Sequence, residues 1–481
     1  MDTNRRPRSS FVLASVVTSA VVSLLMTSCA TLPKADRDLL AAVEANNPGE
    51  VDRALAAGAR LDVHGDQYCD GLPPLGCAAR WGLVETAEAL IAHGADVNGR
   101  GRSGIAPLNA ATRHLQPAVA DLLIRHGADV NVRRQDGETP LHNALETLLS
   151  VPPIETPRPA DVATTKSLVQ LLLSSGAQVD ARSDGGITPI HVAAATGQRT
   201  LVQWLIDRGA DVNTRGANGV TPLHWAAQRN AVAVAQLLIA RGAAVDARTQ
   251  EGYTPLKAAA GEGNPAVAKL LIEHGADVQA RDNEGRTPLL WACNVLLVRY
   301  SLQAMTPAAE DQRHKMSTLE SVRARGALSK VKGEFSDVAV VLLEHGADAN
   351  VGSGEHRPMR TAAIVGDMAL VDALMAHGGR VNPDPENGLE SPLHAAIAES
   401  HDDVAARLID KGADVNALTS RGRTPLHFAV YMHDRRLVEL LIQHGADVNA
   451  RDTEKHTPLA FALKAGRPDL ADLLRQHGAH E

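Results

Sequence analysis

Aromatic residues are scarce in this chain, at 2% of 481 residues, although hydrophobic residues make up 44%. Any core must therefore be built from Ala, Leu, Val and Ile, which can pack at close range. We expect closely stacked helices rather than a core organised around large rings.

An excess of positive charge is also lacking. The chain has 48 Lys and Arg residues against 56 Asp and Glu residues, which gives a net charge of −8. A nucleic acid ligand requires a basic surface that neutralises phosphates, and usually aromatic residues among the basic ones. The composition therefore argues against nucleic acid, and the mild negative charge mainly favours solubility.

Sequence motifs for metal or catalytic chemistry are missing as well. The chain contains no HExxH, no paired CxxC motifs, no GxSxG and no Gly-rich phosphate loop followed by Lys. These motifs hold a metal, a nucleophile or a phosphate at fixed spacing. We expect no metal, no other cofactor, no small-molecule substrate and no enzymatic activity.

The amino terminus has the layout of an export signal. Arg5, Arg6 and Arg8 precede an uncharged apolar run from Phe11 to Met26, and small residues lead to Cys29. The stretch Met26-Thr27-Ser28-Cys29 resembles the lipobox of bacterial lipoproteins, although Leu is usual where Met26 stands.

The lipobox resemblance implies that residues 1–28 are removed as a signal peptide and that Cys29 carries the lipid, including palmitate. Residues 29–34 would form a short tether, and two or more acyl chains would hold the chain at a bilayer. Ala30 after the cysteine predicts the periplasmic side of the outer membrane. The alternatives are a retained signal anchor and a secretory peptide that is cleaved without lipid.

Residues 35–481 are dominated by an internal repeat. A proline recurs mostly 33 residues apart, and a Gly-Ala pair or a close variant recurs in step with it. The prolines are Pro74, Pro107, Pro140, Pro189, Pro222, Pro255, Pro288, Pro358, Pro392, Pro425 and Pro458. With a first copy that lacks the opening motif, we predict twelve units.

Each unit predicts a helix, a turn, a second helix and a hairpin. Thr221 and Pro222 have the preferences of a helix start, and the spacing of Leu223, Ala226 and Ala227 places small apolar groups on one face. Gly242 is placed where a helix ends in a left-handed turn.

TPLH, a following Ala pair and a closing GADVN at this period resemble the ankyrin repeat. The resemblance implies an all-α solenoid of stacked helix-turn-helix units with β-hairpin fingers, in which neighbouring units supply the core. It also implies that the first helices and the hairpin tips line a concave face that binds another protein.

The resemblance accounts for most of the chain's many histidines. In ankyrin repeats the histidine of TPLH bonds the helix-opening Thr, which predicts this role for five residues. They are His142, His191, His224, His394 and His427.

Two cysteines are candidates for a disulfide. Cys69 and Cys77 flank the second predicted hairpin, and an exported chain meets an oxidising compartment. The alternative is two free thiols. Cys293 is predicted to be a small buried apolar residue.

Two insertions interrupt the repeat, at about 146–165 and 295–336. The first is Pro-rich and predicts an irregular or extended loop. The second has helical spacing in parts. Each follows the first helix of its unit and is either a docking surface or a tolerated surface elaboration.

Positions that packing leaves free supply the candidates for partner binding. Arg, Tyr and Trp are frequent interface anchors. The candidates are Arg80, Trp81, Arg113, His114, Arg229, Tyr253, Arg286, Arg423 and Tyr431. Trp225, Trp291 and Phe428 are predicted to pack inside the array.

The ninth unit departs most from the pattern. Arg357 stands where Thr would cap the helix, and Arg360 stands where His would be. Because a missing cap weakens a helix start, we predict a hinge between Gly352 and Gly388.

The sequence thus predicts a non-catalytic scaffold that is lipid-anchored in the bacterial cell envelope and binds an unidentified partner protein. One alternative is an immunity protein that covers a toxin. Others are a secreted effector whose Cys29 is never processed, and an enzyme with a site in 295–336.

Overall fold

The structure is a computed structural model that describes residues 32–64, 69, 71–149, 158–304, 333–353, 357–382, 390–432 and 434–480. The predicted signal peptide and Cys29 lie outside the described residues, as do 305–332 of the second insertion.

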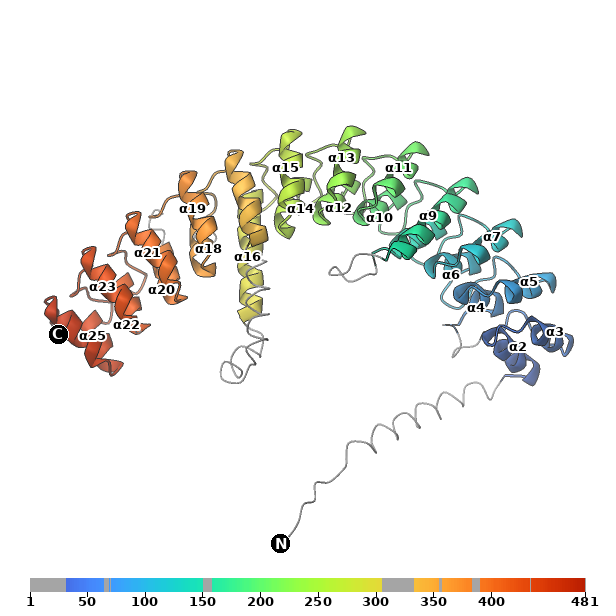
Figure 1. Ribbon diagram of the computed structural model, residues 1–481, viewed down its shortest axis with the longest axis horizontal. Helices are drawn as coiled ribbons and strands as arrows, with labels where there is room; N and C mark the ends of the chain where they lie inside the picture. Colours follow the sequence, from blue (N-terminus) through green and yellow to red (C-terminus); the bar gives the residue numbers. More distant parts are fainter. Residues whose placement is uncertain are drawn as a thin grey trace, which may run out of the picture. The chain divides into compact units, whose positions relative to one another are not determined.

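The chain divides into two compact units, 1–217 and 218–481. The described part of the first unit contains consecutive helix pairs (Figure 1). They are α2 (Lys34–Glu44) with α3 (Pro48–Ala56), α4 (Pro74–Trp81) with α5 (Val84–Ala92), α6 (Pro107–Arg113) with α7 (Pro117–Arg125), α8 (Pro140–Glu146) with α9 (Pro159–Ser174), and α10 (Pro189–Ala195) with α11 (Arg199–Asp207).

The second unit continues the pattern. Its pairs are α12 (Pro222–Gln228) with α13 (Val232–Ala240), α14 (Pro255–Glu262) with α15 (Pro265–Glu273), α16 (Pro288–Ala304) with a helix over 333–344, α18 (Pro358–Val365) with α19 (Met368–Ala376), α20 (Pro392–Ala398) with α21 (Asp402–Asp410), α22 (Pro425–Tyr431) with α23 (Arg435–Gln443), and α24 (Pro458–Lys464) with α25 (Pro468–Gln476). The described residues thus show the twelve expected pairs.

Within each unit the helices form two layers. First helices contact first helices, as in α4·α6 and α12·α14, and second helices contact second helices, as in α5·α7 and α13·α15. The contact residues are small, since Ala226, Ala227 and Ala259 are fully buried. Each repeat therefore shields the apolar face of its neighbour, as the small-residue composition predicted.

The helix-opening motif ties each repeat to the next. The Thr221 N–H donates to His224 Nδ1 at 3.2 Å, and His224 Nε2 lies 3.1 Å from the Tyr253 carbonyl oxygen. A carbonyl only accepts, so Nε2 carries the proton and Nδ1 is the acceptor. The predicted bond to Thr is confirmed at His142, His191, His224 and His427, whereas His394 bonds Ser391, and the ring of His224 also links two repeats.

The loops between repeats turn back on themselves as predicted for hairpins. The Thr249 N–H donates to the Tyr253 carbonyl at 2.9 Å, and Gly252 has a φ of 81° at the turn. The Gln250 N–H donates to the Asn218 carbonyl of the preceding loop at 2.8 Å. In the described ranges these loops are turns without assigned strands.

A second ladder joins the ends of successive repeats. The Asn449 side-chain amide donates to the Gly478 carbonyl at 3.1 Å, and its Oδ1 accepts from the His480 N–H at 2.9 Å. Asn98, Asn131, Asn350, Asn382 and Asn416 make the same pair of bonds. Asp246 occupies this position between two other repeats and only accepts, from the Asp277 N–H.

The prediction of an irregular or extended loop over 146–165 is wrong at its end. Helix α9 begins at Pro159, so residues 159–165 are helical. A proline at the first helical position lacks only a donor that would be unpaired there, so Pro159 starts the helix instead of preventing it. Residues 150–157 lie outside the described residues.

The second insertion begins as a continuation of a first helix. Helix α16 has 17 residues, whereas α12 has seven, and it extends beyond its neighbours in Figure 1. Residues 295–304 of the predicted insertion are therefore helical. In the part of the chain that the structure describes, no helix combines the length and apolarity needed to span a bilayer.

Candidate partner-binding face

The first helices and the loops before them form one surface in each unit, which we call the first-helix face. Five of the predicted candidates lie on it at the carboxyl ends of first helices and are exposed. They are Trp81, Arg113, His114, Arg229 and Tyr431. Trp81 is 36% exposed and Tyr431 65% exposed, so two large aromatic side chains are available to a partner. Arg80, next to Trp81, is half-buried.

The other three candidates make contacts within the array. Arg423 Nε lies 3.3 Å from Asp452 Oδ2, and its guanidinium lies 5.1 Å from the ring centroid of Phe461. Tyr253 and Arg286 are joined to each other, because Arg286 Nη2 donates to the Tyr253 hydroxyl at 3.1 Å. All three are half-buried, so they shape the face more than they project from it.

Tyr253 and Arg286 belong to a charged cluster centred on Lys257. Lys257 stands where other repeats have the TPLH histidine and is 1% exposed. Its ammonium pairs with Asp282, which also accepts from Arg286 Nε at 2.9 Å. The Lys257 ammonium lies 4.3 Å from the ring centroid of Tyr253 and 4.8 Å from that of Trp291.

The pKa values in the cluster follow from burial and pairing. Burial alone would raise the pKa of Asp282, but the hydrogen bonds from Lys257 and Arg286 outweigh it and lower the pKa to about 2. Burial lowers the pKa of Lys257, and the Asp282 carboxylate opposes this change. Asp282 is thus ionised at neutral pH inside the repeat contact.

The structure assigns a further feature to residues that the sequence predicted only to pack. Trp225 and Trp291 are half-buried and border a hollow on the first-helix face, together with Tyr253 and Ala258. Trp225, Ala258 and Trp291 hold the same repeat position in successive repeats. The alternation of large, small and large was the signal that could have revealed the hollow.

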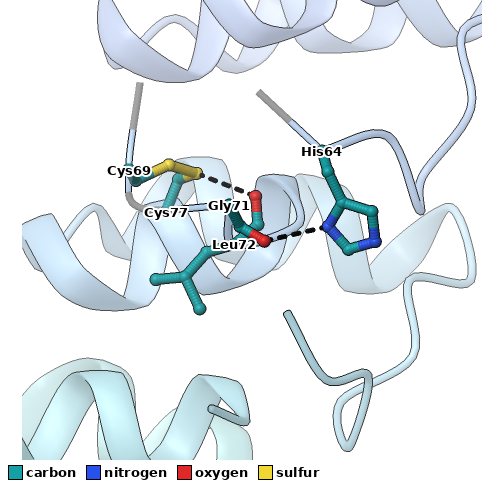
Figure 2. The surroundings of a disulfide bond; sticks show 5 residues. All are labelled: His64, Cys69, Gly71, Leu72 and Cys77. Atoms are coloured by element: carbon teal, nitrogen blue, oxygen red, sulfur yellow. Dashed lines mark hydrogen bonds between the residues drawn. A yellow bond between two sulfur atoms is a disulfide. The ribbon is translucent and has the colours of Figure 1, made fainter. Parts of the chain in front are cut away.

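Cys69 and Cys77 form a disulfide in the structure, with their Cα atoms 5.7 Å apart (Figure 2). His64 Nδ1 donates to the Gly71 carbonyl at 3.0 Å and holds the loop between the two cysteines. The bond closes the loop onto α4, beside Arg80 and Trp81 in the sequence.

The thiol of Cys293 is inaccessible. Cys293 is 1% exposed, and burial raises the pKa of its thiol to about 12, which removes its nucleophilic character. Among the described residues no group of His, Cys, Asp and Glu could hold a metal ion.

Paired helices, small-residue contacts and linking loops at a period of 33 define a repeat solenoid. The sequence profile described as "Ankyrin repeats (3 copies)" matches residues 39–134, 161–249 and 234–300, and "Ankyrin repeats (many copies)" matches 393–442. The chain belongs to the ankyrin repeat family, and its repeats indicate a scaffold for protein–protein interaction.

Two further similarities cover only parts of the chain. Alpha-latrocrustotoxin-Lt1a of Latrodectus tredecimguttatus is 36% identical over 90 residues, which is 18% of this chain and 6% of the toxin. The human ASB11 ankyrin repeat domain, a crystal structure, is 29% identical with a TM-score of 0.38. That match covers 45% of this chain and 90% of the solved chain.

Proposed function

We propose that this protein is a lipid-anchored, non-catalytic scaffold of the bacterial cell envelope that binds one partner protein on its first-helix face. The observation that supports this most directly is the exposure of Trp81, Arg229 and Tyr431 at equivalent helix ends. Trp, Tyr and Arg are the side chains that most often dominate binding energy at protein interfaces. Ankyrin repeats typically serve such a role without catalysis.

Site-specific crosslinking in the native cells tests the binding face. The photoreactive amino acid p-benzoylphenylalanine replaces Trp81, Arg229 or Tyr431 one at a time. The control positions are Glu88 on α5 and Lys269 on α15, which are exposed on second helices. We expect one partner crosslinked from the first-helix positions and none from the controls.

The outcome separates the alternatives. Crosslinks that arise equally from Glu88 and Lys269 contradict binding on the first-helix face. A toxin as the crosslinked partner favours the immunity alternative, in which the same face covers the toxin. No crosslink from any first-helix position contradicts the scaffold.

The lipid anchor is a separate part of the proposal and rests on the lipobox resemblance at Met26 to Cys29. Metabolic labelling with an alkyne analogue of palmitate should label the chain, and Cys29→Ala should abolish the label and release the chain from the membrane fraction. Cys293→Ala is the matched control and should keep the label. Labelling that survives Cys29→Ala contradicts the anchor, and an unprocessed chain favours the effector alternative.

A further inference from the structure

The hollow on the first-helix face of the second unit has a volume of about 290 Å³. Three first helices and the loops before α12 and α14 surround it, and we call it the tryptophan pocket. Its walls are Trp225 of α12, Tyr253 of the loop before α14, Trp291 and Arg299 of α16, and its floor contains Ala258 and Gly261 of α14. A cavity of about 150 Å³ accommodates benzene, so this volume holds a large amino-acid side chain.

The pocket exists because the middle repeat lacks side chains that its neighbours have. Ala258 lies between Trp225 and Trp291 at one repeat position, and Gly261 follows Gln228 at another. A Cβ atom on Gly261 would come within 2.4 Å of Trp291 Nε1, so the indole of Trp291 lies directly over Gly261. Ala258 therefore leaves a gap that two indoles border, and Gly261 gives the Trp291 indole room to lie against α14.

The second insertion supplies one further wall. A first helix of ordinary length ends seven or eight residues after it begins, whereas α16 continues to Ala304. Val295 and Arg299 on this continuation line the pocket, and Arg299 Nη2 pairs with Glu262 Oε2 at 2.9 Å. The extended helix thus closes a side that would otherwise be open.

The walls are held in place by the Lys257 cluster. The ring centroids of Tyr253 and Trp291 lie 5.4 Å apart, and the Arg286 guanidinium lies 4.6 Å from the Trp291 centroid. Lys257 and Arg286 are themselves fixed by the buried Asp282. A preformed pocket binds more tightly because little conformational freedom is lost on binding.

The charges around the pocket select against charged occupants. Lys257 and Arg286 already lie against the faces of Tyr253 and Trp291, which would otherwise attract a cation. Glu262 and Arg299 are paired with each other. A new charge would lose its hydration without gaining a partner, which is costly.

We propose that the tryptophan pocket receives one uncharged aromatic or large aliphatic side chain of the partner protein. This rests on the proposed function and specifies the chemistry by which the second unit recognises its partner. The partner segment presents the apolar side chain as an anchor, and the exposed ends of the first helices contact the surrounding surface.

Fluorine NMR of the full chain in detergent, labelled with 5-fluorotryptophan, tests the pocket. The chain has four tryptophans, so four resonances are assigned by single Trp→Phe substitutions. The probes are N-acetyl-phenylalaninamide, N-acetyl-leucinamide, N-acetyl-argininamide and the α-amide of N-acetyl-aspartic acid, which keeps its side-chain carboxylate. We expect the first two to shift the Trp225 and Trp291 resonances with dissociation constants on the order of millimolar, and the charged probes to leave them unchanged.

Trp81 and Trp204 are internal controls, and their resonances should not move. Ala258→Leu fills the pocket and should abolish the shifts, whereas Ala266→Leu makes the same change at an exposed position of α15 and should preserve them. The comparison among probes uses the unaltered chain, so it does not depend on the folding of a variant.

Three results would overturn the proposal: no shift of Trp225 and Trp291 up to the solubility limit, equal shifts with the arginine probe, or equal shifts of Trp81. Crosslinking from Trp81, Arg229 and Tyr431 reports on the proposed function independently. A chain that crosslinks its partner but fails the fluorine test keeps the scaffold role and loses the anchor pocket.

Discussion

At the scale of single residues, two buried polar side chains determine how adjacent repeats join. The TPLH histidine uses both ring nitrogens, one for its own helix start and one for the next loop. Lys257 replaces it in one repeat and substitutes an ion pair with Asp282 for the two hydrogen bonds. The hydrogen bonds of the histidine are kept only while its ring stays neutral, and the ion pair is kept only while Lys257 and Asp282 stay charged.

The buried histidines should make the array sensitive to acid. Burial lowers the pKa of His394 to about 4 from an ordinary value near 6.5, and it also lowers the pKa of His142 and His427. The unfolded chain therefore binds protons more readily between these values, and the free energy of unfolding falls as the pH drops from 6.5 towards 4. For His394 alone we expect a loss of about 2 kcal/mol between pH 7.5 and pH 5.

Urea unfolding at several pH values measures this loss. His394→Gln keeps a hydrogen-bonding side chain without a titrating group, so it should reduce the pH dependence while it lowers stability at neutral pH. An unchanged pH dependence in this variant would show that His394 is not responsible.

The ion pair between Lys257 and Asp282 predicts that substitutions of these two residues do not destabilise the protein additively. Lys257→Met should destabilise the second unit by about 3 kcal/mol, because it leaves the buried Asp282 without one of its two cationic partners. Adding Asp282→Asn to Lys257→Met should cost less than the sum of the two single changes. Urea unfolding of the four proteins measures the coupling, and additive costs would contradict the pairing.

At the scale of helices and loops, the repeat motif best predicts features that depend on residues close together in the sequence. The cap, the proline start and the small-residue face lie within a few residues of one another, so TPLH and the Ala pair correctly predict first helices that carry them, such as α12. The prediction of a loop was wrong over residues 159–165 because a proline can either end or begin a helix. The residues after Pro159 determine that it begins one. The tryptophan pocket was missed because it depends on the small side chain of Ala258 between neighbours 33 residues away on either side.

The asparagine ladder can be extended across the joint that Asp246 occupies. Asp246→Asn should add a side-chain donor for the Gly275 carbonyl while it keeps the bond from the Asp277 N–H, and should stabilise the array by about 0.5–1 kcal/mol. Asn416→Asp is the matched control, and should destabilise by a similar amount because it removes the donor to the Gly445 carbonyl. Thermal unfolding measures both. Destabilisation by Asp246→Asn would show that the ladder does not govern this joint.

At the scale of the whole molecule, each repeat is stabilised only by the adjacent repeats of its unit. A weak repeat therefore lowers the stability of the repeats next to it. Helix α18 begins after Arg357 with no side-chain cap. Arg360 Nε and Thr361 Oγ1 on this helix are buried without a hydrogen-bond partner. An unpaired buried polar group costs about 1–3 kcal/mol, so these two groups weaken the ninth repeat.

Limited proteolysis should therefore cut first between Gly352 and Gly388. Arg357→Thr restores a cap that is typically worth about 1 kcal/mol and should slow cleavage several-fold. Arg158→Thr, the same change at the N-cap of α9, should leave the rate of cleavage between Gly352 and Gly388 unaltered. First cuts elsewhere in the chain would contradict the prediction of a hinge.

The joints that share the TPLH histidine have one further consequence, which is that the array can be shortened by whole periods. Pro392 and Pro425 lie 33 residues apart, and excision of 392–424 would join Ser391 to Pro425 with His427 in the correct register for the new junction. The same excision across Ala258 would bring Trp225 and Trp291 into adjacent repeats and eliminate the gap between them. Recombination could therefore vary the length of this protein freely at its carboxyl end, while the repeats from Pro222 to Ala304 must be inherited together.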